Sequence, residues 1–151
     1  MATQLVEGNK APAFTAMDEA GKKVTLKDFI GQKVVLYFYP ENDTPTCTIQ
    51  ACNLKDNIAA LEERGFKIIG ISPDAAKSHQ KFKTKYNLPF TLLADEDHKI
   101  IDAYGVWGEK NMYGRKYMGL HRTTFIIDGK GIIERIIKKP KSKMHAAEIM
   151  K

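Results

Sequence analysis

Residues 34–55 read VVLYFYPENDTPTCTIQACNLK and contain both cysteines of the chain. The run from Val34 to Tyr39 has only β-branched, aliphatic and aromatic side chains, which is typical of a strand buried on both faces of a sheet. Pro40 ends this run, and Thr44 and Pro45 supply a cap and a first residue that suit the start of a helix. The stretch therefore predicts a buried strand, a turn, and a helix that begins at Pro45.

Cys47 falls in the first turn of this predicted helix. The first four N–H groups of a helix lack an intrahelical partner, and the helix dipole places partial positive charge beside them. A thiol in that position tends to ionise. A lone cysteine is more often an inert buried thiol, but the strand-to-helix setting favours a reactive thiolate. We therefore predict that Cys47 is a nucleophile.

The spacing Pro40-x-x-x-Thr44-x-x-Cys47, followed by Cys52 five residues later, resembles the signature of peroxiredoxins. Within that family the chain is similar to the atypical two-cysteine subfamily of bacterioferritin comigratory protein, also called peroxiredoxin Q. The likeness extends over nearly the whole chain up to Lys138, and it includes 11–14 (APAF), 104–109 (YGVWGE) and 121–128 (HRTTFIID). One departure is the segment 53–56, where the subfamily leads us to expect an aromatic residue and an arginine. That departure concerns packing rather than chemistry.

The resemblance implies a thiol-dependent peroxidase that reduces hydrogen peroxide and organic hydroperoxides. Cys47 would become a sulfenic acid, and Cys52 would resolve it by forming an intramolecular disulfide. Thr44 and Arg122 would hold the peroxide and stabilise its developing charge, while Pro40 would shield the sulfur from water. A thioredoxin or a similar dithiol protein would restore both thiols. No cofactor is expected, and no metal ion either, because the four histidines show no ligand spacing.

The spacing of the two cysteines sets a geometric condition on that chemistry. Five residues along a regular helix correspond to a rise of roughly 7.5 Å and a rotation of about 140°, which separates the Cα atoms of Cys47 and Cys52 by roughly 8–9 Å. A disulfide requires about 4.4–6.8 Å. We therefore expect the first turns of the helix to unwind if the pair is oxidised.

The rest of the chain predicts an α/β protein. Two strands, 34–39 and 66–72, are separated by a helix that continues to Gly65, so they should lie parallel in one sheet. This order predicts a thioredoxin-like fold with an N-terminal β-hairpin extension, in a single domain that spans residues 1–151. The other expected elements are a hairpin from 13–16 and 23–26, helices at 75–86 and 145–150, a short strand at 91–93 before a short helix capped by 95–97, a long surface loop at 105–119 that ends in a strand at 115–118, and a hairpin from 123–127 and 132–137.

Composition and charge limit the other possibilities. The chain has 151 residues and a net charge of +6, but its lysines are scattered and only those at 138–143 cluster. No nucleic-acid motif accompanies them, so a solvated basic surface is the better interpretation. The N-terminal residues lack the basic and apolar regions of a signal peptide, and no apolar run approaches the length of a membrane span. We expect a cytoplasmic monomer that does not bind membranes or nucleic acid.

Two alternatives to a peroxidase remain open at this stage. A thiol–disulfide oxidoreductase is less favoured, because Cys-x-x-Cys is absent and the five-residue spacing is awkward in a rigid helix. A redox sensor would use the same sulfenic acid to switch a partner, and it would react once per molecule rather than turn over. Gln50, one helical turn after Cys47, is expected either to orient hydrogen bonds at the thiol or to be a solvated helix residue.

Overall fold

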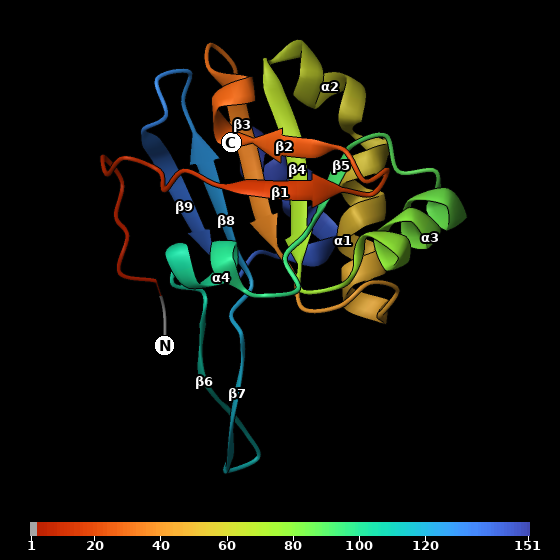
Figure 1. Cartoon of the computed structure of the whole chain (residues 1–151), viewed down its shortest axis with the longest axis vertical. Coiled ribbons are helices and arrows are strands. Elements are labelled where there is room, and N and C mark those ends of the chain that lie inside the picture. Colours follow the sequence, from red (N-terminus) through yellow and green to blue (C-terminus); the bar gives the residue numbers. More distant parts are fainter. Residues whose placement is uncertain (1–2) are drawn as a thin grey trace.

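The computed structural model describes residues 3–151, and a mixed seven-stranded sheet forms its centre (Figure 1). The strands of this sheet lie in the order β2-β1-β5-β4-β3-β8-β9, while β6 and β7 form a separate two-stranded ribbon. The strands are β1 (Thr15–Asp18), β2 (Lys23–Thr25), β3 (Lys33–Phe38), β4 (Phe66–Ser72), β5 (Thr91–Ala94), β6 (Trp107–Met112), β7 (Arg115–Leu120), β8 (Thr123–Ile127) and β9 (Ile133–Lys138). The helices are α1 (Pro45–Asp56), α2 (Ile58–Glu63), α3 (Ala76–Tyr86), α4 (Lys99–Ala103) and α5 (His145–Met150), with single 3-10 turns η1 (Leu26–Phe29) and η2 (Ser142–Met144).

The predicted thioredoxin-like fold is confirmed in its central strands and in its N-terminal hairpin. Strands β3 and β4 are parallel, with Val35 opposite Ile68, and α1 and α2 connect them. Strand β8 pairs with the other side of β3 in the antiparallel direction. The N-terminal hairpin of β1 and β2 extends this sheet, because β1 also pairs with β5.

Alternate side chains of β3 divide the apolar core between the two faces of the sheet. Leu36 and Phe38 pack on one face with apolar residues of α4, whereas Tyr37 packs on the other with apolar residues of α1, α3 and α5. These side chains are almost completely buried, and burial of each large apolar side chain stabilises a protein by roughly 1.5–3 kcal/mol. The sequence therefore reads as a continuous apolar run because helices cover both faces of β3.

The Tyr37 side chain packs closely against Gly70, its partner on the neighbouring strand β4. A Cβ atom at Gly70 would lie 2.9 Å from the Tyr37 ring and 2.9 Å from the Leu92 side chain. Only glycine allows β4 to approach these side chains so closely. This close approach lets Tyr37 lie over the sheet beneath α1.

Two expectations about the elements were wrong. The helix expected to continue to Gly65 is interrupted at Asn57, which caps the end of α1 before α2 begins. No glycine or proline marks this break in the sequence. The segment expected as a loop at 105–119 is instead the ribbon of β6 and β7, paired from Trp107↔Leu120 to Met112↔Arg115, and only the strand expected at 115–118 is confirmed, as part of β7. Most of this ribbon is solvent-exposed, so its sequence carries little of the apolar alternation that identifies a strand.

A buried carboxylate fixes the start of the short helix α4. Asp95 caps α4 as expected, because its carboxylate accepts hydrogen bonds from the N–H groups of Ile100 and Ile101 at 3.1 and 2.8 Å. Burial raises the pKa of this carboxyl group. Within residues 3–151 no helix combines the length and the apolar character needed to cross a bilayer.

Two fully buried histidines make the stability of the folded state depend on pH. His79 lies next to Asn42, whose Nδ2 is 3.0 Å from its Nδ1. His145 lies between Thr124 and Glu148, at 2.9 and 3.0 Å. Burial lowers the pKa of both histidines below the usual 6.5, and the nearby carboxylates oppose this effect only in part. A neutral His79 can accept the amide hydrogen of Asn42, whereas a protonated one cannot.

We predict that these histidines make the folded state acid-sensitive. Below about pH 6.5 the unfolded chain binds protons that the buried rings do not. Their contribution to stability is therefore complete above that pH and is lost as the pH falls toward their lower pKa in the folded state. Urea unfolding at pH 7.5 and 5.5 should show a smaller pH-dependent loss for His145→Gln than for wild type. His98→Asn, a control at a partly exposed histidine, should behave like wild type; an equal loss in all three proteins would contradict the assignment.

Candidate active site

Cys47 occupies the third residue of α1, as the sequence predicts. Thr44 is the N-cap in an extended conformation, and Pro45 is the first helical residue. The Thr44 hydroxyl donates to the carbonyl oxygen of Glu41 at 3.3 Å and makes no side-chain cap to the helix. The N–H groups of the first turn therefore remain available at the end of the helix where partial positive charge is concentrated.

Arg122 reaches Cys47 across a sequence separation of 75 residues. Its Nη2 donates to Cys47 Sγ at 2.7 Å, and its Nη1 donates to Gln50 Oε1 at 3.1 Å. The sheet makes this contact possible because Phe38, the last residue of β3, pairs with Thr123, the first residue of β8. The segment that leads into α1 and the residue before β8 thus meet at the same end of the sheet.

Gln50 belongs to the same cluster and is completely buried. The alternative of a solvated helix residue is therefore wrong. Its oxygen fixes one arm of the Arg122 guanidinium while the other arm points to the sulfur. Its Nε2 has no hydrogen-bond partner within residues 3–151, so the amide is oriented by this single contact. Sequence spacing placed Gln50 one turn from the thiol, but it could not show that the arginine would bridge them.

A polar network that the sequence did not indicate anchors the loop between β3 and α1. The Asn42 N–H donates to Asp74 at 2.8 Å, and its side-chain amide contacts Ser78 and His79 at 3.0 Å each. The Tyr39 hydroxyl donates to the Asn42 side chain at 2.6 Å. This loop carries Pro40 and Thr44, so its attachment to α3 and to the segment between β4 and α3 fixes the chain that leads into the first turn of α1.

Cys52 lies in the same regular helix as Cys47, and both thiols are free. Cys47 is buried, with 2% of its surface exposed, whereas Cys52 is partly exposed. Because α1 is continuous from Pro45 to Asp56, the helical separation of roughly 8–9 Å applies. The two sulfurs cannot join in this conformation.

Asn53, directly after Cys52, ties the middle of α1 to the C-terminal segment. Its Nδ2 donates to the carbonyl oxygen of Lys143 at 2.9 Å, and its Oδ1 accepts from the N–H of Ala146 at 2.8 Å. Both arms of the amide are thus used by the backbone around η2 and the start of α5. The unusual residue at position 53 in the sequence has a structural role as a clip between α1 and α5.

A neutral phenol lies in the same buried cluster as the thiol. Tyr37 is completely buried, and its hydroxyl has no hydrogen-bond partner within residues 3–151. Burial raises the pKa of Tyr37, and the negative charge of the Cys47 thiolate raises it further, so the hydroxyl stays protonated. Tyr37 therefore adds no charge beside the sulfur. The cation that contacts the sulfur is Arg122.

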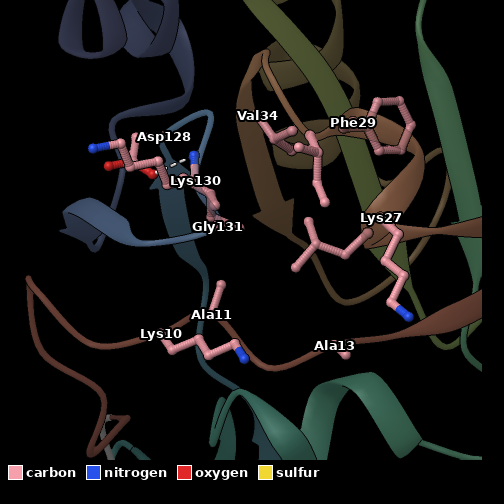
Figure 2. Close-up of a pocket in the computed structure, with 12 residues that line it drawn as sticks. Lys10, Ala11, Ala13, Lys27, Phe29, Val34, Asp128, Lys130 and Gly131 are labelled. Carbon is pink, nitrogen blue, oxygen red and sulfur yellow. Dashed lines mark hydrogen bonds between the residues drawn. The ribbon is translucent and has the colours of Figure 1, made fainter.

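A separate apolar hollow lies at the other end of the sheet (Figure 2). Its volume is about 290 Å³, and it is lined by Phe29, Val34 and Ile127 among others. Val34 is near the start of β3, whereas the thiol follows the end of that strand. None of the candidate site residues lines this hollow. In the part of the chain that the structure describes, no three His, Cys, Asp or Glu side chains gather as a metal site.

A thiol at a helix N-terminus, bound by a guanidinium on a thioredoxin-like sheet, is the arrangement of a thiol peroxidase. Comparison with known proteins agrees, because residues 7–136 match the AhpC/TSA family. The chain belongs to this family, and within it to the Bcp or peroxiredoxin Q group of peroxiredoxins.

The individual relatives cover almost the full chain. The putative peroxiredoxin bcp of Coxiella burnetii is 48% identical over 143 residues, which is 95% of each chain. The peroxiredoxin Bcp of Escherichia coli K12 is 45% identical over 141 residues, or 93% of this chain and 90% of that one. A solved structure of Xanthomonas campestris bacterioferritin comigratory protein, studied for its alkyl peroxide reduction activity, superposes with a TM-score of 0.85 at 32% identity, covering 91% of this chain and 87% of that one.

We predict that Arg122→Lys slows the reaction of Cys47 with peroxide by at least about tenfold, although it keeps the charge. One ammonium cannot bind Gln50, the sulfur and a peroxide oxygen with the fixed geometry of a guanidinium. Stopped-flow measurement of the first turnover tests this. Arg135→Lys, a control on the outer strand β9, should react at the wild-type rate. A rate for Arg122→Lys within about a factor of two of wild type would remove Arg122 from the site.

Proposed function

We propose that this protein reduces hydrogen peroxide and organic hydroperoxides through Cys47, with Cys52 as the resolving thiol and a thioredoxin-like dithiol protein as the reductant. The observation that carries the proposal is the contact of 2.7 Å between Arg122 Nη2 and Cys47 Sγ at the start of α1. It supplies a cation at the sulfur and further N–H donors for a bound peroxide. The alkyl peroxide reduction described for the X. campestris relative supports the substrate class.

The first step is a displacement at oxygen. The Cys47 thiolate attacks the terminal peroxide oxygen, an S–O bond forms, and the O–O bond breaks. The departing oxygen carries the negative charge and takes a proton to leave as water or an alcohol, so the sulfur is oxidised to a sulfenic acid. The Arg122 guanidinium and the N–H groups of the first turn would stabilise this charge, and the Thr44 hydroxyl would join them when it releases the carbonyl oxygen of Glu41. Pro40 shields the same sulfur from water.

The second step forms the disulfide. The Cys52 sulfur attacks the Cys47 sulfenic sulfur, the S–S bond forms, and the S–O bond breaks with loss of water. Because α1 holds the two residues too far apart, its first turns must open before this attack. The dithiol reductant then supplies two electrons and two protons, is itself oxidised to a disulfide, and returns both thiols of this protein.

Residues 1–151 act as one domain, and a monomer suffices because both cysteines lie in one chain. A sensor that reacts once per molecule is the second candidate, and the buried position of Cys47 is compatible with it. Steady turnover of peroxide with a dithiol reductant distinguishes the two functions.

We predict that the two cysteine variants fail at different steps. Cys47→Ser should lose essentially all peroxide consumption. Cys52→Ser should complete the first turnover at the wild-type rate and stop at a sulfenic acid, which over-oxidises in excess peroxide. Intact mass after one equivalent of peroxide should show a loss of two hydrogens in wild type and a gain of one oxygen in Cys52→Ser. Equal loss of the first turnover in both variants would reverse or remove the assigned roles.

We also predict that Asn53→Ala accelerates disulfide formation. It removes two hydrogen bonds between α1 and the C-terminal segment, each worth about 0.5–1.5 kcal/mol, so opening should become about tenfold easier. Quenched-flow mass measurement of the Cys47–Cys52 bond gives the rate. The control is Ile49→Ala, which should form the disulfide at the wild-type rate because Ile49 is an exposed residue of the same helix.

Hydrogen exchange completes this test. Oxidised wild type should exchange rapidly in peptides that cover residues 46–57, while those from β3 and β4 stay protected. Slow exchange of 46–57 in a protein whose mass confirms the disulfide would show that α1 need not open. An unchanged disulfide rate in Asn53→Ala would show that the clip does not oppose opening.

A further inference from the structure

The ribbon of β6 and β7, residues 107–120, projects from the rest of the molecule as an arm (Figure 1). Its base is well anchored. Leu120 is buried, and the Trp107 ring contacts the His98 ring with 4.7 Å between centroids. Lys110 Nζ donates to the Leu120 carbonyl oxygen at 3.0 Å. Beyond this base the arm consists of two strands without a covering helix, so its outer residues face solvent.

Large apolar side chains are exposed along this arm. Met112 and Met118 have 55% and 59% of their surface exposed, and Tyr113 at the tip is fully exposed. Four of the nine large apolar residues exposed in the described chain lie between positions 112 and 118. Scattered exposed apolar residues are normal in soluble proteins, but a concentration on one projecting element indicates a contact surface.

The conformation of Tyr113 strengthens this interpretation. Tyr113 and Gly114 form the two-residue turn with φ values of 54° and 79°. Such turns favour asparagine or glycine at the first position, because a bulky residue is strained at positive φ. The strain at Tyr113 is not offset by packing, since its side chain is fully exposed. An aromatic residue held in this position is explained if its ring is buried in a complex.

One face of the arm combines apolar and cationic groups. The register pairs Met112 with Arg115 and Lys110 with Tyr117, so these four side chains share a face. Together with Tyr113 at the tip, the outer members of this face form a shallow hollow, lined by Met112, Tyr113, Arg115 and Tyr117, which we call the tip surface. The arm contains three basic residues and one acidic residue, Glu109, whose carboxylate pairs with Lys116 at 3.8 Å. The tip surface therefore presents an apolar patch with positive charge.

The arm also projects from the end of the sheet that carries the thiol. Strand β3 runs toward this end (Figure 1), and the chain that follows it leads into α1 and Cys47. At the base of the arm, β7 ends at Leu120, and Arg122 two residues later binds Cys47 Sγ. The arm and the thiol thus lie at the same end of the sheet.

We propose that the tip surface is the docking site for the dithiol reductant, a protein with an apolar patch around its reactive cysteines and carboxylates at the edge of that patch. This inference rests on the proposed function. Apolar contact with Tyr113 and Met112 provides the affinity, while Arg115 attracts the acidic edge and accelerates association. A small dithiol needs no such surface, because it reaches the disulfide without docking.

The difference between protein and small-molecule reductants provides the test. The variant Tyr113→Ser/Arg115→Ser removes the aromatic ring and the cation of the tip surface. Its matched control, Ile30→Ser/Lys67→Ser, removes an exposed apolar residue and an exposed cation near the other end of the sheet. Peroxide turnover is measured with an acidic bacterial thioredoxin and its reductase, and separately with dithiothreitol. The single-turnover reaction of Cys47 with peroxide is measured without any reductant.

The tip variant should lose about tenfold or more in kcat/KM for thioredoxin, mainly through KM, and the control should not. Its turnover with dithiothreitol and its single-turnover rate should equal those of wild type. Added salt should slow the thioredoxin reaction of wild type more than that of the tip variant. An unchanged kcat/KM for thioredoxin, or an equal loss with dithiothreitol, overturns the proposal.

Three further outcomes distinguish failure of the docking site from failure of the proposed function. Loss of a wild-type dimer in the tip variant, seen by sedimentation, would assign the arm to a second copy of the chain and overturn the docking site. A wild-type protein whose Cys47 does not react with peroxide in the single-turnover experiment would overturn the proposed function itself. Turnover of wild type with dithiothreitol but not with thioredoxin would overturn the docking site and leave the peroxidase intact.

Discussion

The pairing of β3 with β8 is the constraint on which the site depends. Phe38 lies opposite Thr123 in that pairing, so the last residue of β3 and the first residue of β8 lie at the same end of the sheet. Strand β3 leads to the helix that holds Cys47, and β8 begins one residue after Arg122. A shift of one residue in this register would turn every side chain of β8 to the opposite face. The sulfur–guanidinium contact is therefore a consequence of strand register, and the buried apolar residues of both strands maintain it.

The sequence predicts the strand, turn and helix around Cys47 much better than it predicts the contacts between segments that are far apart in the chain. The apolar run to Tyr39, the proline and the threonine cap identify a strand followed by a helix, and they place Cys47 in the first turn. Arg122 is different, because an arginine before a strand is usually a surface charge and only the family resemblance selected it. No local pattern shows that Gln50 is buried or that Asn42 contacts His79. These contacts join segments far apart in the chain and require the sheet to be assembled.

Three features of the structure that the sequence does not reveal have physical explanations as well. The arm buries few side chains beyond its base, so the alternation that normally identifies strands is weak there. The break at Asn57 has no glycine or proline to mark it. Asn53 looked like a packing difference, yet its amide makes two hydrogen bonds to backbone groups near the C-terminus. Polar residues on a helix surface give no indication in sequence of the partner they will find.

The clip formed by Asn53 has a consequence for the survival of the enzyme at high peroxide. In the proposed cycle the sulfenic acid has two competing fates: capture by Cys52, which must wait for α1 to open, and irreversible attack by another peroxide molecule. Opening is a property of the protein and does not depend on peroxide, whereas the second attack becomes faster as peroxide accumulates. The ratio of the two rates defines a concentration above which the molecule is destroyed faster than it is regenerated. In this cycle, two hydrogen bonds made by the residue next to the resolving thiol would help to set the oxidant dose that the protein can withstand.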